Sequence, residues 1–514
     1  MSPRSIRTTG TPRTARRIRV IGIWSLAPAV ALATATTFLL GSPASAAPLS
    51  KAAALSKAAA LSKAAATVAT GDSRSVSEPS VPGTVCATLS AQLTISGRTF
   101  SSSQESSPPD TSRIQQKLDS CTSSSGTVAV KLVASGSNNA FLTGPLTVHA
   151  GEVLLIDSST TLYGSRNPAN YQVSGKPTCG TLATSEGGCK PLIQVSGADA
   201  GLEGVQSSGH QGTIDGRGDQ DILGTSTTWW ALAEQAKSAS KDQQNPRLIE
   251  ADSSNNFTMY HINLTNSANF HVVYKGGNGF TAWGVRIKTP ANARNTDGID
   301  PSGASNVTIA NSYIQDGDDG IAIKGGSAAS NMTIRNDYFW GTHGISIGSE
   351  TNGGVKNILF ENNTLNGVDS SGITSSSDNG IRIKSSASNG GAVTQVSYLN
   401  TCLSGMKAPI VLDTHYSSSS GSSIPSFTNI LINGVLATSS SSSATSVLNG
   451  YSSSKPLGVT LENVHLDVSK STAEYAQVQT YNSTLTPSGT GVTVTAISGS
   501  GSVPSCSFPS YPAL

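Results

Sequence analysis

The chain has 514 residues, with 33 Lys and Arg against 31 Asp and Glu, which gives a formal net charge of +2 at pH 7. Residues 1–46 hold six arginines and no acidic residue, so removing their six charges from +2 leaves −4 for the remainder. A mildly acidic chain without a broad basic surface argues against nucleic acid as a partner. Aromatic residues make up only 5% and glycines number 52, which favours short strands joined by turns over helices.

Residues 1–46 are typical of a signal peptide. Six arginines precede an apolar run over residues 20–40, and Ala44-Ser45-Ala46 follows as a cleavage site. This predicts a secreted, extracellular protein with no membrane partner after cleavage. The alternative is an uncleaved anchor, since the apolar run is long enough to span a bilayer. Pro28 and the small residues at the end of the run favour cleavage.

Residues 47–82 are predicted to form a low-complexity linker. Ser-Lys-Ala-Ala-Ala-Leu repeats in tandem from Ser50, and Ser- and Pro-rich text follows. Such a composition is typical of a partly helical spacer and encodes no chemistry. The folded domain is expected to occupy residues 83–514. Residues 111–121 are predicted to form a short helix, with Ile114 and Leu118 one turn apart, that caps the first coil.

Six cysteines remain in this exported chain, and an even number predicts disulfides. Sequence alone allows 15 pairings. We expect Cys86–Cys121, Cys179–Cys189 and Cys402–Cys506, and the short loop of the second pair supports it most directly. Zinc ligation is the alternative, but the spacings match no usual zinc pattern.

A short motif that starts with asparagine recurs through the middle of the chain at steps of 50, 25 and 26 residues, with two coils in the longest step. Its copies begin at Asn256, Asn306, Asn331 and Asn357. A period in the twenties is the signature of a solenoid. Two strands per coil, with apolar residues inward, predict an all-β fold, a right-handed parallel β-helix. The asparagines are expected to form an internal hydrogen-bonded ladder, which their repeat position favours over glycosylation.

A second repeat carries chemistry and consists of a polar residue, a glycine and an isoleucine. We call its polar members the polar column: Asp297, Asp319, His343 and Asn379, at steps of 22, 24 and 36 residues. In a solenoid, residues that recur once per coil stack in space. We therefore expect these side chains on neighbouring coils. The insertion over residues 229–247 is a candidate wall beside them.

Asp318 adds another carboxylate beside the polar column. Neighbouring side chains of a regular strand point to opposite faces, but Gly317 and Gly320 allow the backbone to bend so that Asp318 and Asp319 face the same way. Crowded carboxylates raise the pKa of at least one of them. One protonated acid and one ionised base are what glycosidic hydrolysis needs. Calcium ligation is the alternative, and His343 favours hydrolysis.

Basic residues follow two members of the polar column. If the isoleucines of Ile381-Arg382-Ile383-Lys384 point inward, Arg382 and Lys384 both point outward. Cations beside the carboxylates indicate a substrate that itself carries carboxylates. Lys324 has the same register, but we interpret it as a solvated surface charge.

The segments Asn295-Thr-Asp297, Gly317-Asp318-Asp319, Gly341-Thr-His343-Gly and Arg382-Ile-Lys384 together resemble the four signature motifs of the polygalacturonases, glycoside hydrolase family 28. The resemblance covers residues 82 to the end. It implies a right-handed parallel β-helix that hydrolyses α-1,4 bonds of polygalacturonate, the backbone of pectin, with inversion and without cofactor or metal. We expect a monomer.

The resemblance also implies roles for single residues. Asp318 would be the general acid and would be kept protonated by His343, while Asp297 and Asp319 would activate water. The implied substrate-binding residues are Asn295, Arg382, Lys384 and, as a stacking residue, Tyr416. Inversion requires the acid and base carboxyls to lie roughly 6.5–9.5 Å apart.

Four other functions remain open at this point. Cutting could be internal or from chain ends, and we expect internal cutting. A pectate lyase on the same scaffold would use calcium and an arginine base and leave an unsaturated product. Rhamnogalacturonan is an alternative substrate, which His343 and the Arg382-Ile-Lys384 segment disfavour. A non-catalytic β-helix adhesin would bind pectin without releasing reducing ends.

Overall fold

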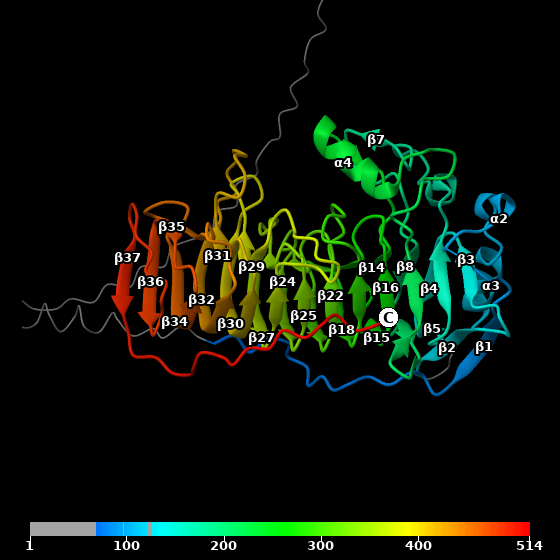
Figure 1. Cartoon of the computed structure of the whole chain (residues 1–514), viewed down its shortest axis with the longest axis horizontal. Helices are drawn as coiled ribbons and strands as arrows, with labels where there is room; N and C mark the ends of the chain where they lie inside the picture. The colour runs from blue at the N-terminus through cyan, green and yellow to red at the C-terminus, as the bar shows by residue number, and fades with distance from the viewer. Residues whose placement is uncertain (1–67, 96, 122–125) are drawn as a thin grey trace, which may run out of the picture. The chain divides into compact units, whose positions relative to one another are not determined.

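The computed structural model describes residues 68–95, 97–121 and 126–514. The predicted signal peptide and most of the expected linker lie outside these residues. The described residues all belong to one compact unit, and their strands stack coil on coil as a right-handed parallel β-helix (Figure 1). The all-β prediction is therefore confirmed. The prediction of two strands per coil is wrong, because most coils contain three.

Most coils contribute to each of three parallel ladders. The first ladder comprises β1 (Val85–Ser90), β2 (Val128–Val133), β5 (Glu152–Ile156), β9 (Gly201–Gly204), β15 (Thr258–Tyr260), β18 (Asn278–Trp283), β21 (Ser305–Ala310), β24 (Ala329–Arg335), β27 (Val355–Glu361), β30 (Ala392–Ser404), β32 (Ser426–Thr438), β34 (Leu457–Leu466), β36 (Ala476–Tyr481) and β37 (Thr493–Ala496).

The second ladder contains mostly three- or four-residue strands. It comprises β3 (Ala140–Thr143), β6 (Thr161–Gly164), β12 (Thr213–Asp215), β16 (Asn263–Thr265), β19 (Arg286–Lys288), β22 (Tyr313–Gln315), β25 (Tyr338–Trp340), β28 (Thr364–Asn366) and the second halves of β30, β32 and β34. Each of these short strands follows the first-ladder strand of its coil after a tight turn. The sequence pattern therefore does not separate the second-ladder strand from the first-ladder strand.

The third ladder carries the polar column at its entrance. It comprises β4 (Leu146–His149), β8 (Ile193–Ser196), β14 (Ile249–Asp252), β17 (Val272–Lys275), β20 (Ile299–Ser302), β23 (Ile321–Ile323), β26 (Ile345–Ile347), β29 (Asn379–Lys384), β31 (Ala408–Asp413), β33 (Ser446–Asn449) and β35 (Ser471–Glu474). All of its pairings are parallel.

The core runs through the inside of the coils, because inward residues at equivalent positions stack on one another. Rings stack in the same way: Phe257 lies 5.2 Å from Phe280, and Phe360 lies 4.4 Å from Tyr398, between ring centroids. All four are fully buried. Stacked aromatic and aliphatic residues exclude water along the whole solenoid, which stabilises each coil against its neighbours.

The first coil is capped as expected. Helix α3 (Thr111–Ser120) buries Ile114 and Leu118 completely, which confirms the predicted helix. A shorter helix, α2 (Ser102–Ser106), precedes it and was not predicted. Its Glu105 is buried and accepts a 2.6 Å bond from Arg217, so the cap is joined to the coils by a buried ion pair.

The insertion over residues 229–247 contains helix α4 (Trp229–Ala239) and strand β13 (Asp242–Gln243), which pairs with β7 (Leu182–Ala183). Figure 1 shows α4 and β7 standing out from the coils near β8 and β14. The remaining short elements are η1 (Pro168–Tyr171), β10 (Gln206–Ser207) and β11 (His210–Gln211).

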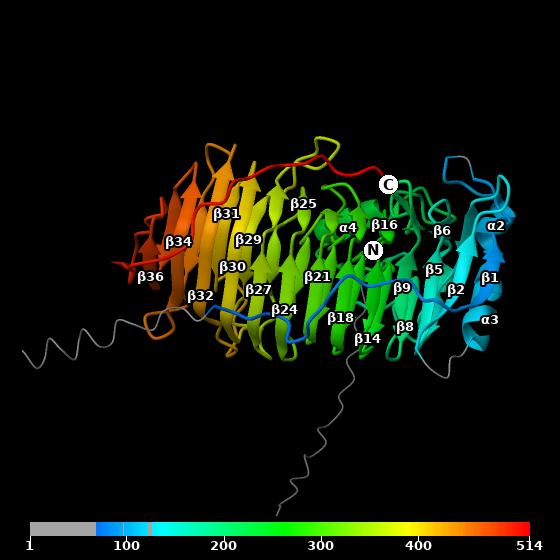
Figure 2. The same cartoon turned by 90° about the horizontal axis from the view of Figure 1, so that it is seen from below.

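Residues 68–82, which we expected to belong to the linker, instead lie along the outside of the first ladder, and residues 498–514 return along the coils from the other end (Figures 1 and 2). The Ala69 amide donates to Ser397 Oγ, and Tyr260 donates to Glu78. At the other end of the chain, Tyr511 donates to the carbonyl of Ile287. Polar side chains on the outer faces of strands thus bind both segments.

The asparagine ladder exists, but it is not internal. Asn357 donates to Asn331 at 2.8 Å, whereas Asn306 bonds Asn278 and Asn256 bonds Asp199. The four repeated asparagines are half-buried or exposed. Each of them has a positive φ within or beside its strand, a conformation that asparagine tolerates better than most residues.

The three predicted disulfides, Cys86–Cys121, Cys179–Cys189 and Cys402–Cys506, are all formed. The last one ties the C-terminal segment to β30. Within the residues that are described, the helices are too short or too polar to cross a bilayer.

Candidate active site

The polar column lies where its sequence period predicts. Ile299 pairs with Ile321, Ile321 with Ile345, and Ile345 with Ile381. The residue two positions before each isoleucine therefore occupies the same place on four successive coils. A glycine must follow it, because a Cβ at Gly298 would lie 2.4 Å from the carbonyl oxygen of the next coil.

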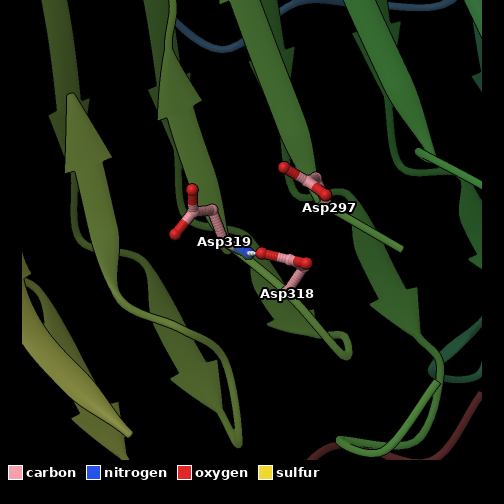
Figure 3. A group of neighbouring side chains, drawn as sticks. All are labelled: Asp297, Asp318 and Asp319. Atoms are coloured by element: carbon pink, nitrogen blue, oxygen red, sulfur yellow. Dashed lines mark hydrogen bonds between the residues drawn. The ribbon is translucent and has the colours of Figure 1, made fainter. Parts of the chain in front are cut away.

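Asp297, Asp318 and Asp319 lie close together on two neighbouring coils (Figure 3). One oxygen from each carboxylate lies within 4.8 Å of the others. The roughly 6.5–9.5 Å expected between an inverting acid and base is a separation of whole carboxyl groups, so the spacing of single oxygens does not test it and that expectation stays a prediction. Gly317 is required because a Cβ there would meet the carbonyl oxygen of Ala293 at 2.0 Å.

Asp318 is held by donors on both of its oxygens. His343 Nδ1 lies 2.9 Å from Oδ1, and Asn295 Nδ2 donates to Oδ2 at 3.2 Å. Burial raises the pKa of Asp318, but the bond from His343 and the nearby lysines outweigh it and lower this pKa below its ordinary value. The expectation that His343 keeps Asp318 protonated is therefore wrong for the free site, because a donor to a carboxylate favours the ionised form.

Asp319 is paired with both predicted substrate-binding cations. Lys384 Nζ lies 2.7 Å from Oδ2, and Arg382 lies 3.2 Å from Oδ1, which also accepts from Ser346. Burial raises the pKa of Asp319, but the charges of Lys384 and Arg382 lower it by more, so the net shift is downward. Both cations point outward from the coils, as predicted. In the free protein they form ion pairs with Asp319.

Asp297 differs from its two neighbours. It is buried, and within the described residues its Oδ1 has no hydrogen-bond donor. Burial and repulsion from Asp318 and Asp300 raise its pKa well above the usual range. The backbone beneath is fixed by His271, whose Nδ1 lies 3.1 Å from the carbonyl oxygens of Thr296 and Asp297. Complete burial lowers the pKa of His271 to about 4, so the ring is neutral at pH 7.

The interpretation of Lys324 as a solvated surface charge is wrong. Its side chain is 21% exposed, lines the same pocket and lies 3.9 Å from Asp300. Burial raises the pKa of Asp300 to about 7 despite this cation. The signal was present in the sequence, because Lys324 follows Ile321 by three residues as Lys384 follows Ile381, and the two isoleucines belong to the same ladder.

These residues line one pocket of about 330 Å³, which we call the carboxylate pocket. Its lining residues are Phe270, Arg294, Asn295, Asp297, Asp318, Asp319, Lys324, His343, Ser349, Ser377, Arg382, Lys384 and Tyr416. All eight predicted site residues are thus brought together. Tyr416 is 46% exposed and lies over Arg382 and Lys384, at 5.3 and 5.0 Å from its ring centroid.

Five lining residues besides the predicted set were missed: Phe270, Arg294, Lys324, Ser349 and Ser377. Phe270, Ser349 and Ser377 lie in loops that enter or leave the third ladder, where no repeat marks them. The insertion contributes as well, since Gln243 donates to Asn295 Oδ1 at 3.2 Å. This contact supports the expected position of the insertion beside the pocket.

Residues 145–486 match the model of the glycosyl hydrolases family 28. The chain belongs to glycosyl hydrolase family 28. It is 40% identical over 447 residues to a polygalacturonase of Ralstonia solanacearum, which covers 78% of this chain and 82% of that protein. It is also 40% identical over 405 residues to an endo-polygalacturonase of Pectobacterium carotovorum subsp. carotovorum, covering 78% and 91%.

A solved structure agrees with this family 28 membership. The polygalacturonase from Erwinia carotovora ssp. carotovora superposes with a TM-score of 0.69 at 37% identity, covering 82% of this chain and 99% of that one. The present protein is accordingly a glycoside hydrolase with the β-helix of its family.

The charges in this family 28 pocket also bear on the calcium alternative. The three carboxylates are close enough to share a cation. However, both oxygens of Asp319 already accept from Lys384, Arg382 and Ser346, and Asp318 accepts from His343 and Asn295. A calcium ion would have to displace these donors and sit beside two further basic side chains, Arg294 and Lys324, which disfavours it electrostatically.

Proposed function

We propose that this protein hydrolyses internal α-1,4-galacturonosidic bonds of polygalacturonate, the backbone of pectin, by acid–base catalysis with inversion. The observation that carries the proposal is the carboxylate pocket, where three carboxylates and several cations line one open pocket. The names of the relatives, polygalacturonase and endo-polygalacturonase, support the same substrate.

Asp318 is the general acid in this proposal. In the free pocket the proton resides on Asp297, which has the raised pKa, while Asp318 is ionised. A glycosidic oxygen placed against Asp318 is an acceptor, and a bond from the protonated carboxyl to that oxygen raises the pKa of Asp318. Because the two carboxylates titrate as a coupled set, substrate binding draws the shared proton onto Asp318.

The transfer of the proton from Asp297 to Asp318 also leaves Asp297 ionised, so that it can act as a base. When the proton leaves Asp297, its Oδ1 becomes a free acceptor for water, because no donor in the described chain occupies it. Asp319 is kept ionised by Lys384 and Arg382. Asp297 and Asp319 then hold the attacking water between them and take up its proton.

Internal cutting is supported by how the pocket is built. Its lining residues come from six successive coils, from Phe270 before β17 to Tyr416 after β31. Five intervals of about 4.8 Å give a groove length of about 24 Å along the coils. A groove of this length suits a polymer chain that passes through rather than a chain end.

Extracellular action follows from the same proposal. Three disulfides persist in oxidising compartments, which supports a secreted protein. We propose that it acts as a monomer on cell-wall pectin. Asn295, Arg382, Lys384 and Tyr416 are the proposed substrate-binding residues.

Product sizing on polygalacturonate, for the wild type and Asp318→Asn, tests the function. We expect the wild type to release mixed oligomers early, and the variant to bind polygalacturonate but lose at least about two orders of magnitude in rate, as for a removed general acid. A variant with near-normal turnover would refute the acid assignment. If the wild type released no reducing ends, the whole proposal would fail.

The anomer of the first product tests inversion. We expect NMR of the early products to show the β-anomer from the α-linked polymer. An initial α-anomer would overturn the proposed roles of Asp297 and Asp319.

A further inference from the structure

The carboxylate pocket contains one cation that the described protein does not neutralise. Its five basic lining residues are Arg294, Lys324, His343, Arg382 and Lys384. Four of them lie within 4.0 Å of a carboxylate: Arg382 and Lys384 at Asp319, His343 at Asp318, and Lys324 at Asp300. Arg294 has no such partner among the residues that the structure describes.

Arg294 is also short of hydrogen bonds. Its Nε is buried without an acceptor in the described chain, and its side chain is only half-buried where it lines the pocket. An arginine keeps its charge at every working pH and presents a planar set of donors that fits a carboxylate. Leaving such a group unpaired next to a pocket is costly unless a ligand pairs with it.

The position of Arg294 along the coils indicates where a ligand carboxylate would bind. Arg294 precedes β20, whereas Arg382 and Lys384 belong to β29, three coils further along. Asp318 and Asp319 lie before β23, between these two coils. A chain that crosses the pocket therefore meets a cation on each side of Asp318 and Asp319.

We propose that Arg294 binds a second carboxylate of the uronate polymer, on the side of the scissile bond opposite Arg382 and Lys384. This rests on the proposed function and adds a specificity determinant to it. Phe270, on the preceding coil, lines the same pocket, and its ring is contacted by Arg247 and Lys324.

A consequence is that the protein selects unesterified uronates at two positions. A methyl ester removes the negative charge of the carboxylate, so an esterified unit cannot form a charge-assisted bond with Arg294. Esterification at this position should weaken binding without altering the acid or the bases.

Steady-state kinetics of Arg294→Gln, Arg294→Lys and the charge-matched control Lys356→Gln test the proposal. Lys356 is exposed on β27 and makes no ion pair in the described structure. On polygalacturonate we expect Arg294→Gln to raise KM by about 10- to 100-fold, as for a lost charge-assisted bond, with kcat within about threefold. Arg294→Lys should give an intermediate KM, and Lys356→Gln should match the wild type.

Two further readouts separate binding from a structural role. KM of the wild type should rise more steeply with salt than KM of Arg294→Gln, and the variant should lose less activity on highly methyl-esterified pectin than on polygalacturonate. An unchanged KM, equal losses on both substrates, or an equal effect of Lys356→Gln would overturn the proposal. A wild type inactive on polygalacturonate would instead refute the proposed function, so the two failures are distinguishable.

Discussion

Lys384→Gln gives a quantitative test of the electrostatics around Asp319. Lys384 Nζ lies 2.7 Å from Asp319 Oδ2, and the two side chains are 8% and 1% exposed. Removing one partner of a buried pair costs about 3–5 kcal/mol. Arg382 and Ser346 still hold Oδ1, so we expect about 3 kcal/mol, at the low end of that range. An unfolding entropy of about 2.1 cal/mol/K per residue, over roughly 430 residues, converts this into a Tm lowered by about 3 °C.

The Tm difference between the wild type and Lys384→Gln should depend on pH in a defined direction. Because the pKa of Asp319 is lowered in the folded state, the stabilisation is present above the unfolded-state pKa and is lost as the pH falls through the folded-state pKa. The Tm difference between wild type and variant should therefore be full at neutral pH and shrink in acid. The acid limb of kcat/KM should move to higher pH in the variant, since the base must be ionised.

Calorimetry from neutral to acidic pH, together with the pH profile of kcat/KM, measures both effects. Lys356→Gln is the control, and it should change neither Tm nor the acid limb. In the double variant Asp319→Asn, Lys384→Gln, the Lys384 substitution should have little further effect on Tm. A Tm difference that stayed constant with pH would mean that lost packing, not charge, explains the variant, and would refute the reasoning.

Two other predictions concern the lyase alternative and the disulfides. Chelators should leave activity unchanged and the products should not absorb in the ultraviolet, whereas loss of activity with an absorbing product would indicate a calcium-dependent lyase. Cys402→Ser, Cys506→Ser should lower the free energy of unfolding by up to about 4.7 kcal/mol, because that bridge closes a span of 104 residues. The 10-residue span of Cys179–Cys189 should contribute only about 2.7 kcal/mol, and calorimetry showing the reverse order would contradict this account.

Repetition explains what the sequence could predict about the fold. The recurring asparagine motif and the polar column gave the solenoid, and Ile299, Ile321, Ile345 and Ile381 pair in the predicted register. The second ladder was missed because strands such as β22, with three residues, are too short for an alternating pattern. The outer position of residues 68–82 was missed as well, because their contacts are to outward side chains far along the chain.

The residues of the site likewise fall into those that the sequence could predict and those that only the structure shows. Period and register were sufficient to assemble the three carboxylates, His343, Arg382 and Lys384, because a residue that recurs once per coil must stack. Lys324 carried the same register, and its role was misjudged because one charge in a sequence does not reveal its partner. Arg294 has no repeat to mark it, so only the three-dimensional structure shows that it lines the pocket without a carboxylate partner among the described residues.

The sequence by itself determined the β-helix and which of the predicted side chains gather at one place, whereas the structure settled which of the 15 possible disulfide pairings is formed. The tertiary structure alone decided the protonation of that place: a lowered pKa for Asp318 and Asp319, and a raised one for Asp297. The physical reason is that a pKa depends on burial and on donors a few ångströms away, and these come from several coils and from the insertion. Periodicity fixes which residues are neighbours, but it does not fix which of them donates to which oxygen.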